Sequence, residues 1–102
     1  MVIDLKANEI VKKAGNVQHV NGTGEIKGKL ILTNQRLYFK TVEDNHQDSD
    51  MEIMPTEIQE LLYFKTGIFF NNGLTVLTRQ GEELKFVVKK RDSWSQLINK
   101  MY

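Results

Sequence analysis

The residues best suited to chemistry by type and spacing lie in an acidic stretch near the middle of the chain. Potential metal ligands alternate there with other residues, in the order Asp44, His46, Asp48, Asp50 and Glu52. A calcium-binding loop with such alternation also needs a glycine at its sixth position and a glutamate at its twelfth. Those positions hold Ser49 and Pro55. We therefore expect no metal site, and we interpret residues 43–50 as a mobile acidic loop.

Groups for nucleophilic or acid–base catalysis have no recognisable arrangement in this sequence. It contains two histidines, His19 and His46, and no cysteine, which excludes a thiolate nucleophile, a disulfide and a thiolate metal site. Neither histidine has a nucleophile at a catalytic spacing, and no glycine-rich phosphate loop or zinc pattern is present. We therefore predict that the protein is not an enzyme and uses no cofactor.

The length and charge of the chain narrow its domain organisation and the partners that it can bind. The chain of 102 residues corresponds to a single domain, residues 1–102. Its net charge of +1 provides no domain-wide basic surface, and the short cluster Lys89-Lys90-Arg91 is predicted to be solvated, so we expect no nucleic-acid partner. The N-terminus lacks the apolar core of a signal peptide, and no apolar run approaches the ~20 residues of a membrane-spanning helix. These features predict a cytoplasmic protein.

Alternation with a period of two organises the chain around a hairpin in residues 28–39. Leu30 and Leu32 share one face of the first run, Leu37 and Phe39 continue that face in the second, and Asn34 suits the turn between them. We expect the leucines and Phe39 to point inward, and Ile31 and Thr33, which share the other face of the first run with Lys29, to point outward. Lys27 and Lys29 then fall on the opposite face, where they are available to an anionic headgroup or to solvent.

The remaining strands are predicted from the same signals. The first covers residues 9–21, with an interruption near Gly15-Asn16, and a later one covers residues 58–66 after a helical turn. A short strand over residues 51–54 should stop at Pro55, because proline cannot continue a sheet ladder. A second hairpin joins residues 74–78 to 84–88 through a turn at 79–82.

The last element is predicted to be a helix over residues 93–102. Ser93 and Gln96 have the spacing of a capping box, with Asp92 as a competing cap. Its apolar residues fall at offsets 0, 3, 4 and 7, which places them on one helical face: Trp94, Leu97, Ile98 and Met101. A helix this short is unstable alone, so its apolar face must cover the sheet. The expected fold is mainly β, about seven antiparallel strands in a bent barrel closed by this helix.

The order of these pieces resembles a GRAM domain of the pleckstrin-homology-like superfamily, in particular its stand-alone bacterial members. The most specific match is the run from Gly28 to Phe39, GKLILTNQRLYF. Weaker matches lie in the right order on either side of this run, at residues 8–10 before it and at residues 72–76, 80–88 and 91–94 after it. The resemblance covers roughly residues 5 to 101, and it implies two packed antiparallel sheets with a C-terminal helix and a non-catalytic role.

The resemblance also implies a set of candidate binding residues. Lipid-binding pleckstrin-homology domains use a lysine on strand one and a basic-x-arginine pair on strand two. The positions that match are Lys12 or Lys13 and then Lys27-x-Lys29, with Lys29 in place of the arginine. A second candidate is the apolar run Ile68-Phe69-Phe70 near Lys65, which suits insertion into a membrane interface or a partner groove, or folding back over the barrel.

Two functions follow from these readings. The first is an interaction module that binds a protein partner or another copy of itself at a sheet edge or beside the helix. The second is a peripheral membrane domain that binds anionic lipid headgroups through the four lysines. Co-sedimentation with anionic vesicles separates the two, because only the second requires binding to lipid.

Overall fold

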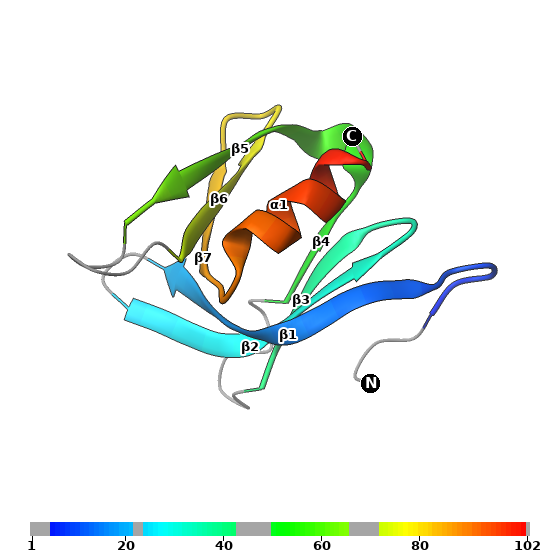
Figure 1. Cartoon of the computed structure of the whole chain (residues 1–102), viewed down its shortest axis with the longest axis horizontal. Helices are drawn as coiled ribbons and strands as arrows, with labels where there is room; N and C mark the ends of the chain where they lie inside the picture. The colour runs from blue at the N-terminus through cyan, green and yellow to red at the C-terminus, as the bar shows by residue number, and fades with distance from the viewer. Residues whose placement is uncertain (1–4, 22–23, 43–49, 66–71, 102) are drawn as a thin grey trace.

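Seven strands form one antiparallel sheet in a computed structural model that describes residues 5–21, 24–42, 50–65 and 72–101 (Figure 1). The strand order is β4-β3-β2-β1-β7-β6-β5. The strands are β1 (Val11–Asn21), β2 (Gly24–Thr33), β3 (Leu37–Thr41), β4 (Met51–Ile53), β5 (Ile58–Phe64), β6 (Gly73–Thr78) and β7 (Glu83–Val87). A 3-10 turn, η2 (Pro55–Glu57), precedes β5, and helix α1 (Arg91–Asn99) follows β7. The mainly β architecture with a C-terminal helix confirms the predicted fold class.

The sheet is bent so strongly that its two halves share one interior. Strands β3 and β7 are separated by β2 and β1, which would place them about 14 Å apart in a flat sheet. The ring centroids of Phe39 on β3 and Phe86 on β7 are nevertheless 5.7 Å apart. The two halves are hydrogen-bonded to each other through β1 and β7. The structure is therefore one continuous sheet, where the resemblance implied two.

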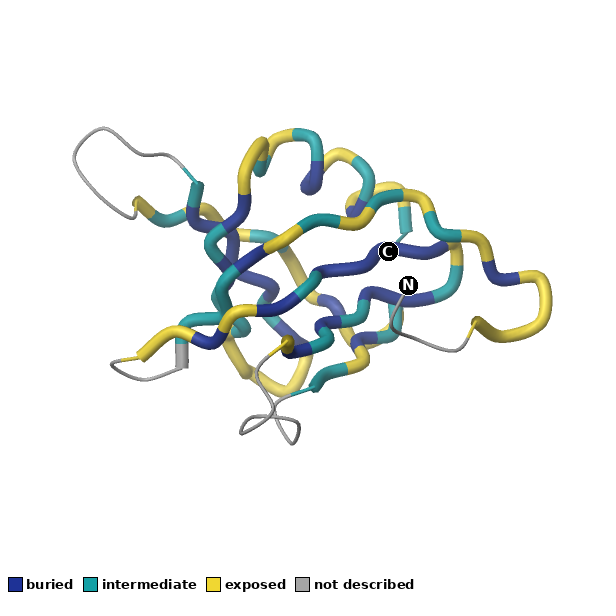
Figure 2. The backbone as a smooth tube through the Cα atoms, turned by 90° about the horizontal axis from the view of Figure 1, so that it is seen from below, coloured by how far each residue is buried: buried dark blue, intermediate teal, exposed yellow. Residues whose placement is uncertain are grey.

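The core confirms the inward face that was predicted for the central hairpin. The inward face of β2 and β3 is fully buried, and so are Phe86 and Val88 after it. Helix α1 lies across the bent sheet (Figure 1) and adds Trp94 and Ile98 to the same apolar cluster. Figure 2 shows buried positions recurring along the strands, while exposed positions gather at the turns. Leu30, Leu32, Leu37, Phe39, Phe86, Val88, Trp94 and Ile98 are each at most 3% exposed.

Two predictions about the strands were wrong. Strand β1 continues through Gly15-Asn16 without a break, and its irregularity lies between Val11 and Lys13 instead. Ile31 and Thr33, which alternation assigned to the outer face, are fully buried. Thr33 can be buried because its hydroxyl donates to the Glu9 carboxylate at 2.6 Å.

The start of the helix also differs from the prediction. Helix α1 begins at Arg91, and its N-cap is Lys90 rather than Asp92 or Ser93. Lys90 has φ 56° and ψ 52°, which is the left-handed conformation, and it makes no side-chain capping bond. The capping-box spacing was therefore misleading, because the helix begins directly after Lys90 and already includes Asp92 and Ser93.

A buried ion pair fastens the residues before β1 to the turn between β2 and β3. The Arg36 guanidinium donates to Glu9 Oε2 at 2.8 Å and to Glu52 Oε2 at 2.6 Å. The hydrogen bond from Arg36 is the main cause that lowers the pKa of Glu9 from 4.5 to about 2, against the opposing effect of burial. Among the described residues, no buried side-chain nitrogen or oxygen lacks a partner, so this network is structural.

Candidate lysine cleft

Two adjoining cavities lie between the β1–β2 hairpin and the turn from β7 into α1. The larger has a volume of about 550 Å³ and the smaller about 240 Å³. Asn16 and Lys89 line both, so the cavities form one cleft. We call this surface the lysine cleft, after its four lysines: Lys13, Lys27, Lys89 and Lys90.

The cleft exists because β1 and β7 pair only briefly. Their ladder covers Gln18–Val20 of β1 and Lys85–Val87 of β7. The earlier part of β1 continues beside β2 alone, while the chain after Val87 turns away into the helix. Gly15 of β1 and Trp94 of α1 both line the smaller cavity. The Trp94 ring lies so close to Gly15 that a Cβ at this position would be in van der Waals contact with it, at 3.5 Å.

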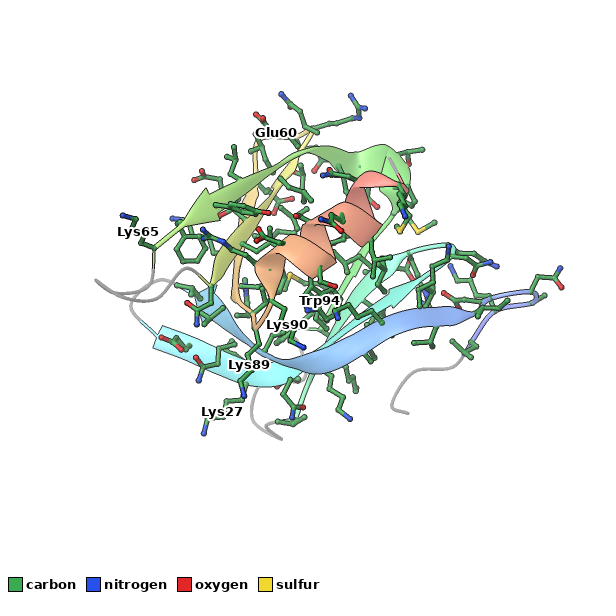
Figure 3. The ribbon with its side chains drawn as sticks, in the orientation of Figure 1. Lys27, Glu60, Lys65, Lys89, Lys90 and Trp94 are labelled. Carbon is green, nitrogen blue, oxygen red and sulfur yellow. The ribbon has the colours of Figure 1, made fainter. Side chains whose placement is uncertain are left out.

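Each lysine reaches the cleft from a different local structure. Lys13 lies in β1, with its Nζ 5.3 Å from the centroid of the Trp94 ring, a cation–π distance. Lys89 and Lys90 are exposed residues of the β7–α1 turn, and Lys27 is an exposed residue of β2. Figure 3 shows Lys90, Lys89 and Lys27 in succession beside this turn, with Trp94 close by. Among the described residues that line the two cavities, none is acidic, so the lysines favour anions there.

The structure brings together only part of the predicted lysine set. Lys13 and Lys27 line the cleft, whereas Lys12 and Lys29 line neither cavity. Lys12 lies at the irregularity of β1 between Val11 and Lys13, where the regular pairing with β2 is interrupted. Lys89 and Lys90, which were predicted to be solvated, are exposed, and they also line the cleft. Their proximity in sequence was visible, but the pairing of β7 with β1 was not.

The third residue of that basic cluster has a different role. Arg91 donates from Nη1 to the carbonyl oxygens of Phe64 and Gly73, at 3.0 and 3.1 Å. Its guanidinium carbon also lies 4.0 Å from the centroid of the Tyr63 ring. The Tyr63 hydroxyl in turn bonds to Asp92 at 2.9 Å and to Ser95 at 2.6 Å. Arg91 therefore joins the end of β5 to α1 and takes no part in the cleft.

The described residues provide no arrangement for metal binding. No group of three or more histidine, cysteine, aspartate or glutamate residues among them could hold a metal ion. The centroid of the His19 ring lies 5.6 Å from that of Phe39 and 5.2 Å from that of Phe86. The His19 Nδ1 is 3.0 Å from the Lys85 carbonyl oxygen. These contacts give His19 a packing role.

Other predicted features are placed only in part. Asp50, at the end of the acidic stretch, bonds to Lys40 Nζ at 2.7 Å and to the Thr41 amide at 2.8 Å. The rest of the predicted acidic loop and the run Ile68-Phe69-Phe70 lie outside the described residues. In the part of the chain that the structure covers, no helix has the length and apolar character needed to cross a membrane.

Comparison with solved structures shows the fold of a pleckstrin-homology domain. The C-terminal domain of an unknown protein from Leishmania infantum aligns with a TM-score of 0.77 at 21% identity, over 93% of this chain and 86% of that one. The Vps36 N-terminal PH domain aligns with a TM-score of 0.71 at 16% identity, over 95% of this chain and 81% of that one. The linker-DH/PH domains of p115-RhoGEF align with a TM-score of 0.72 at 13% identity, over 94% of this chain and 30% of that one. No family model and no curated protein matches the sequence.

Proposed function

We propose that this chain is a non-catalytic interaction module of the GRAM type that docks peripherally on anionic membrane surfaces through the lysine cleft. The observation that carries the proposal is the convergence of Lys13, Lys27, Lys89 and Lys90 on one cleft whose described lining residues include no carboxylate. Each basic residue near an anionic surface is worth about 1 kcal/mol. Four such lysines together contribute up to about 4 kcal/mol, which corresponds to weak, reversible binding with a Kd of about 1 mM.

Apolar groups beside the lysines support a membrane partner in preference to a soluble anion. Val42 lines the larger cavity and is 58% exposed, which suits contact with the interfacial region of a bilayer. The sequence also places Ile68, Phe69 and Phe70 shortly before Asn72, which lines the same cavity. Insertion of these three residues into the interface stays a prediction.

Co-sedimentation with phosphatidylserine-containing vesicles tests the proposal. Removing two charges by Lys89→Ala and Lys90→Ala should weaken binding about 30-fold, at ~1 kcal/mol for each lysine. The matched control is Lys12→Ala with Lys100→Ala, because both residues are exposed and line neither cavity. Undetectable binding of the native chain at low salt would refute membrane docking. Equal losses in the two double variants would refute the cleft as its site.

Strand β5 supports the second candidate function, binding of a protein segment or another copy of the chain. Within the described residues, β5 pairs with β6 alone and forms an edge of the sheet. Leu62 and Tyr63 on this strand are 38% and 48% exposed, and exposed edges are templates for strand addition. Sedimentation velocity tests this candidate: self-association that Leu62→Lys abolishes would support it, and a monomer at all concentrations would exclude the second copy.

A further inference from the structure

We propose that the lysine cleft binds a single-chain anionic amphiphile, with its charged head in the smaller cavity and its alkyl chain in the larger one. This inference rests on the proposed function in that the same lysines attract the anion. It goes further by assigning a ligand of defined chemistry to the cleft: one alkyl chain that bears a phosphate or a carboxylate. Electrostatic attraction to a membrane surface would not need a cavity, whereas this ligand does.

The two cavities differ in chemical character, which gives the ligand its direction. Three of the four lysines line the smaller cavity: Lys13, Lys89 and Lys90. Among the described lining residues, every valine lines the larger cavity: Val17, Val42, Val87 and Val88. Lys27 and Lys89 line the larger cavity as well, so the two cavities differ mainly in the aliphatic wall of the larger one. This wall suits an apolar tail, and the lysines beside it suit an anionic head.

The larger cavity has the size and lining of a ligand site. Its volume of about 550 Å³ lies within the ~300–1,000 Å³ of small-molecule pockets, which combine apolar walls with a few polar groups. Val17 and Val88 are 5% and 1% exposed and belong to the core, so that part of the wall is fixed. Val42 is the most exposed of the four valines, and an alkyl chain beside it would remove this apolar surface from water.

The junction of the cavities fixes where head and chain meet. Asn16 and Lys89 line both cavities, so the anionic group lies beside Lys89 when the chain extends along the valines. At this junction the Asn16 amide can donate a hydrogen bond to the head, which strengthens binding of a charged acceptor. Trp94, the single tryptophan of the sequence, lines the smaller cavity and is therefore a natural fluorescent reporter of the head.

The test is a titration with n-alkyl phosphates of four, eight, ten and twelve carbons, each below its critical micelle concentration. Trp94 fluorescence and calorimetry report binding to the native chain. We expect one site for each chain and a Kd that falls up to about fourfold for each added methylene, at ~0.8 kcal/mol per buried CH₂. The fall should stop once the alkyl chain fills the cavity. An alkyl glucoside of equal length should bind about 5- to 30-fold more weakly, because a neutral head loses the lysine contacts at a cost of ~1–2 kcal/mol.

Two variants separate the head from the chain. Lys89→Ala should weaken the binding of every alkyl phosphate by the same factor, whatever the length of its alkyl chain. Val42→Asn should flatten the dependence on chain length and leave butyl phosphate unchanged. Ile10→Asn is the matched control, because Ile10 is also an exposed apolar residue but lines neither cavity. Both Asn variants alter exposed positions, so their folds should survive, and thermal melting checks this.

Each outcome bears on a distinct claim. Equal affinity for butyl and decyl phosphate would overturn the alkyl site, and if vesicle binding still depended on Lys89 and Lys90 the proposed membrane function would stand. If Val42→Asn leaves the dependence on alkyl-chain length unchanged, the proposed alkyl site is also overturned, because the alkyl chain would then bind elsewhere. If the protein binds decyl phosphate saturably but does not bind vesicles, the alkyl site is upheld and membrane docking is refuted.

Discussion

Replacing Lys90 by glycine should make the fold more stable and the cleft less able to bind anions. Lys90 is the N-cap of α1 and has φ 56°, a conformation that costs an L-residue other than glycine or asparagine roughly 1–2 kcal/mol. Glycine adopts this conformation without that cost. The chain therefore keeps a lysine at a position where the backbone favours glycine, and we attribute this choice to the charge that Lys90 brings to the smaller cavity.

The expected changes follow from these values. Glycine also increases the entropy of the unfolded chain, which offsets ~0.5–1 kcal/mol of the gain. The net stabilisation is about 0.5–1 kcal/mol, or a rise of about 2–8 °C in Tm for a domain of this size. Binding to anionic vesicles should weaken about fivefold, because one lysine near the surface contributes ~1 kcal/mol.

Differential scanning calorimetry and vesicle co-sedimentation measure the two effects on the same preparation. The matched control is Lys89→Gly, which removes an equal charge from the cleft at a residue without positive φ. It should weaken binding by a similar factor while lowering Tm. If Lys90→Gly leaves Tm unchanged or lowers it, the strain argument fails. If Tm rises while binding is unaltered, Lys90 has no role in the cleft.

Three further predictions concern the fold. Glu9→Gln should lower the free energy of unfolding in urea by about 3 kcal/mol. This is the low end for breaking a buried ion pair, because Arg36 keeps its ion pair with Glu52. An unchanged urea midpoint would show that the Glu9–Arg36 pair does not stabilise the fold. Since the pKa of Glu9 is lowered from 4.5 to about 2 on folding, its contribution is complete above pH 4.5 and is lost as pH falls toward 2. Urea midpoints at several pH values should therefore decline in that interval more steeply for the native chain than for Glu9→Gln, and parallel curves would refute this. Trp94→Ala should cost about 3–5 kcal/mol and lower Tm markedly, whereas an unaltered Tm would mean that α1 does not cover the core.

Local patterns in the sequence predicted most of the fold. The two hairpins were found because Leu30, Leu32, Leu37 and Phe39 alternate around a short turn, and hairpin contacts are close in sequence. The helix was found because Trp94 and Ile98 share a face. The buried position of Thr33 was not predictable in this way, since it depends on Glu9, which is 24 residues distant.

The candidate site was predicted only in part, because long-range pairing creates it. Lys13 and Lys27 were selected by resemblance, but the cleft forms where the pairing of β1 with β7 ends. The strands that meet there are far apart in sequence: the Nδ1 of His19 on β1 lies 3.0 Å from the carbonyl oxygen of Lys85 on β7, across 66 positions. The left-handed turn at Lys90 had no sequence signal either, because lysine gives no preference for that conformation.

The most direct test of the central claim is a map of amide chemical shifts as phosphatidylserine-containing bicelles are added to the ¹⁵N-labelled chain. The account predicts that the largest changes fall in residues 13–18, at Lys27 and Val42, and in residues 87–90. Changes confined to β5, or spread evenly over all exposed lysines, would contradict binding at the lysine cleft.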